Sequence, residues 1–331
     1  MNKKTIKTMS NPSKVLLAVA AGEDLTKLEL RERTSLSMST VISSVDALVK
    51  RNLITFEERK GERGGKPHSV INAHPHRRVY GVSYKSGVLT ATAVDLKGCS
   101  RESLSQEVEE GASLTQSVLS LLLALQERAP DPLTMAVSIN CEEKVALLKG
   151  LEDRFGVPAI SCTNTTAVAY LALWKGAELP VAALGIGAGV KCAVIEGEGR
   201  RNINLGGLPS SPLVTGEGTF RAALCSSAVE ETLRRSRYRG QYVLNEGYLA
   251  EINDLGEYSR ALAKTIASLA GLIRVTLSPA RTVLFGEYLS EAFFERIVKE
   301  SPESDLTFFQ ADRPAFALGT ALCALKEGVF N

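Results

Sequence analysis

The chain has 331 residues, of which 44% are hydrophobic and 23% are charged. This is an ordinary globular composition, long enough for two or three domains, and it excludes a disordered chain or a fibre. The longest apolar runs, residues 118–125 and 181–188, are far shorter than the ~20 residues that a membrane span requires. The N-terminus carries lysines but no apolar segment of a secretory signal, so we expect a cytoplasmic protein with no membrane contact.

The charge is divided unevenly along the chain. Residues 1–78 hold 15 basic and 8 acidic side chains, a net charge of +7, whereas the remainder holds 24 basic and 29 acidic side chains, a net charge of −5. A small basic module joined to a large acidic one predicts a nucleic-acid contact that is confined to the N-terminal region.

Three short helices are predicted at the start of the chain. Residues 13–21 form an amphipathic segment that Gly22 ends, and residues 25–33 form a second helix with Leu25, Leu28 and Leu30 at its apolar positions. Ser37 is a natural N-cap for a third helix. One face of this third helix is expected to be apolar and to carry Val41, Val45, Leu48 and Val49.

A hairpin is predicted directly after these helices. Residues 53–58 and 68–72 resemble strands, and they flank the basic, glycine-rich segment RKGERGGKP. This order is that of a winged helix-turn-helix, although a small helical bundle followed by a charged hairpin would give a similar pattern. The combination with the local positive charge favours DNA binding. The expected DNA contacts come from the third helix and the wing, namely Ser37, Met38, Ser39, Thr40, Ser43, Ser44, Arg59, Lys60, Arg63 and Lys66.

Histidine and cysteine residues give little sign of a metal site. His68, His74 and His76 occur at the end of the wing and in the linker, without a nearby cysteine, so a metal site there is the less favoured interpretation. The six cysteines show no CxxC spacing. We therefore interpret them as buried, reduced thiols rather than as a disulfide or metal framework.

The remaining chain alternates between strands and helices in an order that repeats. Three meandering strands begin at Val79, with a tight turn at residues 85–87, and helices at about 113–128 and 143–155 alternate with two further strands. A second set of strands begins near residue 181 and is followed by helices and a buried strand at residues 281–287. The fold class is α/β, and the repetition predicts two lobes with a cleft between them.

Five segments of the chain carry a resemblance to a known family. They are RGGKP in the wing; VYGVSYKSGVLTATAVDLKG; LEDRFGVPAISCTNTTAVAY; LGIGAGVKCAVIEGEGR; and LSPARTVLFGEYLS with ADRPAFALGTALCAL near the end. In this order and spacing, over about residues 12–328, the chain resembles the ROK family of sugar kinases and transcriptional repressors.

The resemblance implies an actin-like, ribonuclease-H-like (ASKHA) fold, to which the repressors of the family add an N-terminal winged helix-turn-helix. The implied domains are a DNA-binding domain at residues 1–76, a first lobe at residues 77–165 plus 310–331, and a second lobe at residues 166–309.

The positions that match the kinases' catalytic groups have changed. The kinases carry an Asp in the first hairpin that helps to hold the nucleotide's metal, and here the matching segment begins at Ser83, with Tyr84 and Lys85 crowding the loop. Their catalytic Asp takes a proton from the sugar hydroxyl, and here Asn164 and Thr165 occupy that turn. A threonine hydroxyl cannot serve as that base near neutral pH, so we expect the chain not to be an enzyme.

The family's sugar and zinc motifs are also lost. The sugar-binding motif maps loosely onto residues 207–211 without its carboxylate and imidazole, and downstream of Ser211 the chain has no His and only Cys225 and Cys323. A tetrahedral zinc site cannot be assembled from these residues, so no metal and no cofactor are expected.

Two further groups of residues allow two interpretations each. Gly185, Gly187 and Gly189 of the second hairpin either approach a nucleotide or make a tight turn between twisted strands, and the loss of the other nucleotide groups favours the turn. The second group either lines a polar cleft for a neutral ligand or satisfies loop backbone groups; it comprises Asn164, Thr165, Asn204, Ser210 and Ser211.

These observations predict a sequence-specific DNA-binding transcriptional regulator, expected to be a repressor, with an inactive kinase-like domain. The resemblance implies a double-stranded DNA operator, a homodimer or dimer of dimers, a role in carbohydrate metabolism and a sugar or sugar derivative as effector. The alternatives are an active ROK sugar kinase with an accessory DNA-binding domain, and an interaction scaffold whose winged helix contacts protein.

Overall fold

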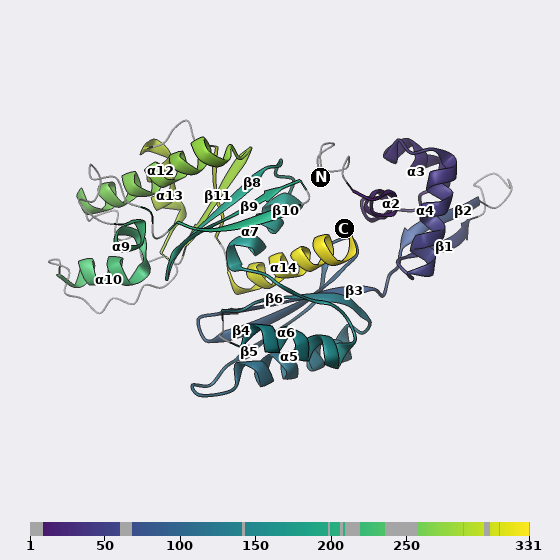
Figure 1. The fold of residues 1–331 in the computed structure, drawn as a ribbon, viewed down its shortest axis with the longest axis horizontal. Helices are drawn as coiled ribbons and strands as arrows, with labels where there is room; N and C mark the ends of the chain where they lie inside the picture. The colour runs from purple at the N-terminus through teal and green to yellow at the C-terminus, as the bar shows by residue number, and fades with distance from the viewer. Residues whose placement is uncertain are drawn as a thin grey trace. The chain divides into compact units, whose positions relative to one another are not determined.

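The structure is a computed structural model, and it describes residues 9–59, 68–140, 143–197, 199–205, 208, 219–235, 257–286, 288–300, 305–310 and 312–330. Its N-terminal region contains the three predicted helices and the two wing strands (Figure 1). Their bounds are α2 Asn11–Ala20, α3 Lys27–Thr34, α4 Met38–Lys50, β1 Ile54–Arg59 and β2 His68–Ala73. The second helix begins later than predicted because Thr26 caps it: the Thr26 side chain and Glu29 form a reciprocal capping box.

The N-terminal region has a core of its own. β1 pairs with β2 in an antiparallel register, and the backbone of Leu25 pairs with that of Ile71, which ties the start of α3 to the wing. The residues buried between α2, α3, α4 and the wing are Val15, Leu16, Val19, Leu30, Val41, Val45, Leu48, Leu53 and Ile71. Two expectations are wrong: Leu28 and Val49 are 49% and 39% exposed, because their faces of α3 and α4 point away from this core.

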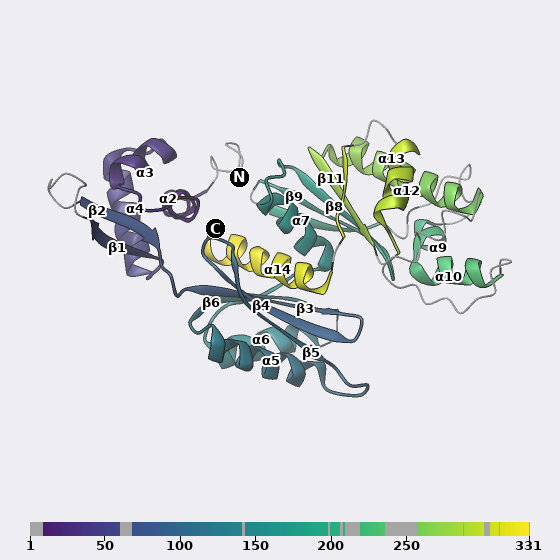
Figure 2. The ribbon, with the colours of Figure 1, turned by 180° about the vertical axis from the view of Figure 1, so that it is seen from behind.

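The first sheet has five strands in the order β5-β4-β3-β6-β7. β3, β4 and β5 are antiparallel neighbours, whereas β6 and β7 run parallel to β3. Helices α5 and α6 cover one face of this sheet and α14 covers the other, as both views show (Figure 2). The bounds are β3 Arg78–Lys85, β4 Val88–Asp95, β5 Ser100–Glu107, α5 Leu114–Arg128, β6 Pro132–Ser138, α6 Lys144–Phe155, β7 Ala159–Ser161 and α14 Arg313–Ala324, the last followed by the π-helical turn η2 Leu325–Val329.

Coverage on both faces explains why every residue of β4 is buried. Tyr80, Val82 and Leu89 belong to the core on the α5 and α6 side. Gly81 lies on the other face, where a Cβ atom would be 2.1 Å from the backbone nitrogen of Ala321 in α14. The close approach of α14 to the sheet therefore requires glycine at this position.

The second sheet repeats the first. Its order is β10-β9-β8-β11-β12, again with three antiparallel strands and two parallel additions. Helix α7 packs on one face, and α9, α12 and α13 contribute to the core on the other. The bounds are α7 Asn164–Trp174, β8 Val181–Ile186, β9 Val190–Glu196, β10 Gly199–Asn204, α9 Phe220–Leu224, α10 Ser226–Arg235, α12 Glu257–Leu277, β11 Arg281–Gly286, α13 Glu291–Glu300 and β12 Leu306–Phe308.

By its contacts the chain forms two compact units. One contains Asn164–Asp312, and the other contains Lys3–Thr163 with Arg313–Asn331. Each unit therefore includes one of the two equivalent sheets, and the final helix α14 returns to the first sheet. The duplication predicted from the sequence is confirmed by the identical strand order. Within the described residues, no helix combines the length and apolar character that crossing a bilayer demands.

Candidate nucleic-acid interface

Helices α3 and α4 are joined by a turn of three residues, Ser35, Leu36 and Ser37. Ser35 has a left-handed backbone, with φ of 56°, which ends α3 and redirects the chain. Ser37 caps α4, since its Oγ accepts a hydrogen bond from the backbone N–H of Thr40 at 3.2 Å. The predicted cap of the third helix is confirmed.

The first turn of α4 displays hydroxyl groups at the surface. Ser37 Oγ lies 2.9 Å from Ser39 Oγ and 2.8 Å from Thr40 Oγ1, and Ser43 donates to the carbonyl oxygen of Thr40 at 3.1 Å. Ser37, Ser39 and Ser43 are exposed, whereas Met38 and Thr40 are half-buried. Short hydroxyl side chains at a helix N-terminus allow the backbone to approach an anion or a base edge closely.

One expected DNA contact is wrong. Ser44 is only 2% exposed, because it lies on the same side of α4 as the buried Val41, Val45 and Leu48. The prediction treated residues 37–44 as one continuous contact segment, but the helical repeat places Ser44 on the side of α4 that faces the core. Ser44 is thus a packing residue and is not available to DNA.

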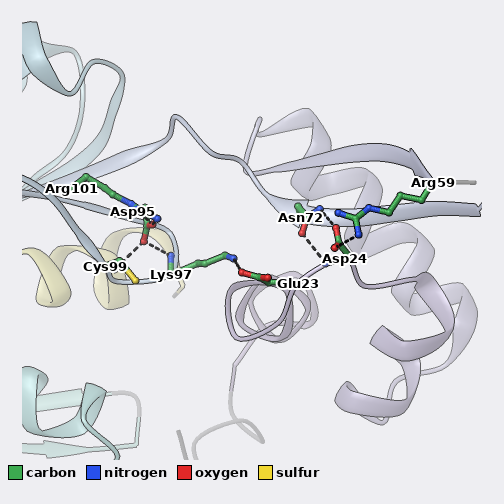
Figure 3. A network of polar contacts seen from close by, with 8 residues as sticks. All are labelled: Glu23, Asp24, Arg59, Asn72, Asp95, Lys97, Cys99 and Arg101. Carbon is green, nitrogen blue, oxygen red and sulfur yellow. Dashed lines mark hydrogen bonds and ion pairs between the residues drawn. The ribbon is translucent and has the colours of Figure 1, made fainter.

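The wing residue Arg59 already has a partner (Figure 3). Its guanidinium lies 2.6 Å from a carboxylate oxygen of Asp24, and the Asp24 carboxylate also accepts a hydrogen bond from the side-chain amide of Asn72 at 2.9 Å. Asn72 in turn accepts from the backbone N–H of Asp24 at 2.9 Å. Arg59 therefore joins β1 to the α2–α3 turn, and its charge is partly neutralised there. The other expected wing contacts, Lys60, Arg63 and Lys66, lie outside the described residues.

A second polar network follows the strand pair β3–β4 of the first five-stranded sheet. Asp95 accepts hydrogen bonds from the backbone N–H groups of Lys97 and Cys99, each at 2.9 Å, and from Arg101 Nε at 2.8 Å. Lys97 Nζ lies 3.0 Å from a carboxylate oxygen of Glu23. Figure 3 shows this contact between the β4–β5 turn and the α2–α3 turn.

Several exposed residues of α3 and α4 were missed from the sequence. Arg31 and Arg33 are exposed in the last turn of α3, and Ile42 and Asp46 are exposed on α4. A helical count from Ser39, at intervals of three and four residues, places Ile42, Ser43 and Asp46 on one surface. That count was available from the sequence and would have found them.

The turn between β3 and β4 is exposed at the surface. Ser86 and Gly87 have φ values of 51° and 76° and form a two-residue hairpin between β3 and β4. Ser83 is 1% exposed. Lys85 Nζ lies 5.0 Å from the centre of the Phe316 ring, and Arg313 donates to the carbonyl oxygen of Ser86 at 3.4 Å. Lys85 and Ser86 therefore contact α14, and the predicted crowding of the turn by Tyr84 and Lys85 stays a prediction.

The predicted turn at Asn164 and Thr165 is the beginning of a helix. Helix α7 starts at Asn164, so Asn164 and Thr165 lie in its first turn rather than in a loop before it. Thr165 is 6% exposed, and a Cβ atom on Gly185 would be 2.9 Å from its Cγ2 and 2.7 Å from Phe285 Cζ. The fully buried Thr166 donates to Asn202 Oδ1 at 2.8 Å.

Packing thus explains Gly185, whereas a Cβ atom on Gly189 would make only an ordinary contact, 3.8 Å from Lys191 Cε. Of the five expected cleft residues, Asn164 is half-buried, Thr165 is buried, and Asn204 is exposed at the end of β10. Asn204 is two residues from Asn202, the partner of Thr166. Ser210 and Ser211 lie outside the described residues.

The cysteines are mostly inside the protein. Cys162, Cys192, Cys225 and Cys323 are buried and form no disulfide within the described residues, while Cys99 is exposed, which corrects the expectation for that residue; Cys141 is outside the described residues. Burial raises the pKa of the Cys192 thiol to about 12, so it remains protonated and unreactive near neutral pH. His74 and His76 have ring centres 6.1 Å apart, and the pKa of His74 is lowered by burial and by nearby Arg77.

Comparison with known proteins gives structural matches alone. No protein-family model and no curated protein matches the chain. A ROK family transcriptional regulator, a homologue of the E. coli MLC protein, matches with a TM-score of 0.75 and 15% identity over 99% of this chain and 98% of its own. A ROK hexokinase from Thermus thermophilus matches with a TM-score of 0.60 and 16% identity over 74% of this chain and 97% of its own.

A ROK glucokinase from Streptomyces griseus, solved with glucose and AMPPNP, matches with a TM-score of 0.55 and 16% identity over 74% of this chain and 98% of its own. The kinases leave about a quarter of this chain unmatched, whereas the regulator spans nearly all of it. The fold predicted from the sequence is confirmed: the chain has the actin-like fold of ROK proteins, built on two sheets of identical order. The structural match to the ROK regulator covers 99% of the chain.

Proposed function

We propose that the chain is a sequence-specific DNA-binding transcriptional regulator whose kinase-like region is catalytically inactive. The observation that carries the proposal is the helix-turn-helix, in which a capped α4 presents Ser37, Ser39 and Ser43 to the surface. The net charge of +7 on residues 1–78 supplies the attraction to phosphate that such a helix needs.

The proposed DNA contacts are divided between α4 and the wing. Ser37, Met38, Ser39, Thr40 and Ser43 would enter the major groove, and Lys60, Arg63 and Lys66 would contact the backbone or an adjacent groove. Arg59, which was expected to contact DNA, is proposed instead to fix the wing to the α2–α3 turn through its ion pair with Asp24. A homodimer would place two such surfaces on a roughly palindromic operator.

The loss of catalysis is supported by what replaces the two kinase carboxylates. Thr165 is buried against Gly185, and Ser83 is buried in β3. Neither side chain supplies an anion that could hold a metal or remove a proton from a sugar hydroxyl. We propose that the chain needs no metal or cofactor, acts in the cytoplasm as a repressor in carbohydrate metabolism, and responds to a sugar or sugar derivative.

The DNA proposal is tested with the full chain and a duplex from the region upstream of its own gene, with a shuffled duplex as control. Fluorescence anisotropy should show selective binding whose affinity falls steeply between 50 and 200 mM salt, by roughly 10³-fold if about six phosphates are contacted. Replacing Arg63 and Lys66 together with Ala should lower the affinity and the salt slope. An affinity that does not depend on salt would contradict the proposal and favour a protein-binding scaffold.

The catalytic proposal has a separate test. The purified chain is incubated with ATP, Mg²⁺ and a panel of hexoses, and the release of ADP is followed by a coupled assay. We expect no turnover above the buffer control. Sugar-dependent turnover that disappears when Asn164 is replaced with Ala would show instead an active sugar kinase with an accessory DNA-binding domain.

A further inference from the structure

The exposed surface of α4 has a definite composition. On the opposite side, Val41, Ser44, Val45 and Leu48 are buried. The exposed surface begins with the hydroxyl groups of the first turn and ends near the wing. Its members, spaced by three or four residues, are Ser39, Ile42, Ser43, Asp46, Val49 and Lys50, and we call them the outer face of α4.

Ile42 is the apolar residue at the centre of this outer face. It is 40% exposed, although the adjacent Val41 is fully buried and completes the core on the other side. A single exposed isoleucine is common on a protein surface. Here, however, it lies one helical turn beyond Ser39 and one before Asp46, within the surface that we propose to contact DNA.

Asp46 indicates which part of the duplex this centre faces. Its exposed carboxylate follows Ile42 by four residues, and a carboxylate against the phosphate backbone would be repelled. Over the base edges the same group finds a donor, because cytosine presents its amino group in the major groove. The centre of the outer face therefore suits the groove floor, while the exposed Arg31 and Arg33 of α3 suit the phosphates.

The groove floor offers one apolar group to an isoleucine, the C5-methyl of thymine. We propose that Ile42 reads a thymine in each operator half-site by contact with this methyl group, and so determines specificity at that base pair. This inference rests on the proposed function. It predicts that the preferred operator loses affinity when the methyl is removed, even though every hydrogen-bonding group of the base pair is retained.

The experiment begins with a duplex selected from a random pool by the full chain. Each thymine is then replaced by deoxyuridine, which removes the methyl group alone, and binding is measured by anisotropy. We expect one position per half-site where the affinity falls about three- to ten-fold, the effect of losing one buried methyl contact. Ile42→Ala should bind the thymine duplex with a similar loss and should no longer distinguish thymine from deoxyuridine.

Two variants control for general effects. Val49→Ala removes a comparably exposed apolar side chain, 39% exposed, from the same helix, and it should keep the deoxyuridine sensitivity at the thymine read by Ile42. Ile42→Val keeps a shorter apolar side chain and should retain part of that sensitivity. Circular dichroism should show that all three variants are folded.

The outcomes separate this inference from the function on which it rests. If the wild-type chain binds a selected duplex but is indifferent to every deoxyuridine substitution, or if Ile42→Ala keeps the wild-type sensitivity, the assignment of Ile42 is wrong and DNA binding stands. If no duplex is selected at all, both the proposed function and the assignment are wrong.

Discussion

Helices α4 and α7 begin with similar sequences but have different surroundings. Helix α4 begins after Ser37 with Met-Ser-Thr, and α7 begins with Asn-Thr-Thr. The hydroxyls at the start of α4 bond to one another and to their own helix, and Ser37 and Ser39 are exposed. In α7, Thr165 and Thr166 are buried, and Thr166 donates to a neighbouring strand.

The difference shows that burial, rather than residue type, separates the two roles. A hydroxyl-rich helix N-terminus can bind an anion or a base when it is exposed. The same groups serve packing when a sheet covers them. At the start of α7, the side chains of Thr165 and Thr166 pack against β8 and β10.

The largest expected effect comes from disturbing the packing beside α7. In Gly185→Ala the new Cβ would be 2.7 Å from Phe285 and 2.9 Å from Thr165, so we expect the free energy of unfolding to fall by about 2–3 kcal/mol. Gly189→Ala is the matched control, because its Cβ would have no neighbour closer than 3.8 Å, and it should change stability by less than about 0.5 kcal/mol.

Chemical denaturation measures both variants, and anisotropy measures their DNA binding at a temperature where they are folded. The affinity for DNA should be unchanged in each. Equal stabilities for the two alanine variants would show that the start of α7 is more loosely packed than the structure indicates, and the contrast with α4 would be lost.

The second effect concerns the exposed hydroxyls of α4. Replacing Ser39 and Ser43 together with Ala removes two groups from the outer face, and we expect the affinity for the selected duplex to fall about ten-fold. Because both residues are exposed, the free energy of unfolding should change by less than about 0.5 kcal/mol. The reverse result, lost stability with unchanged affinity, would assign these serines a structural role like that of Thr166.

Much of the fold was predictable because its signals are local. Strand and helix order, the Ser37 cap and the repeat of the two sheets follow from apolar periodicity, capping residues and glycine positions. The burial of Ser44 also follows from periodicity, once each residue is counted around the helix. The ion pair of Arg59 with Asp24 could not be predicted in this way. The two residues are far apart in the sequence and meet because Leu25 pairs with Ile71.

The two turns at Ser86–Gly87 and Asn164–Thr165 were predictable in part. The sequence resemblance implies that Ser83 and Thr165 replace two carboxylates, and this replacement stays a prediction. The start of α7 at Asn164 was not predicted, because Asn and Thr favour loops and caps over helix interiors and tertiary packing overrides that preference. Contacts of Gly81 with α14 also join distant segments, and a sequence pattern carries no signal for them.

A smaller effect is expected at the cap of α4. Ser37→Ala removes the acceptor of the Thr40 N–H bond, and it should lower the free energy of unfolding of the N-terminal region by about 1 kcal/mol. Ser37→Asp restores an acceptor at the positive end of the helix and should recover most of that stability. Thermal denaturation followed by circular dichroism measures both, and an Asp variant no more stable than the Ala variant would contradict a capping role.

The smallest expected effect separates the two roles of Arg59. Its ion pair with Asp24 is partly exposed, with 54% and 29% of the two side chains accessible, so Arg59→Ala should lower the free energy of unfolding by at most about 1 kcal/mol. The loss should disappear in an Asp24→Asn background, where the partner charge is already removed. A residue that contacts phosphate would instead reduce the salt slope of DNA binding by about 1. Because Asp24 already pairs with this guanidinium, we expect Arg59→Ala to leave the salt slope of DNA binding at the wild-type value. A reduced slope would show that Arg59 contacts DNA.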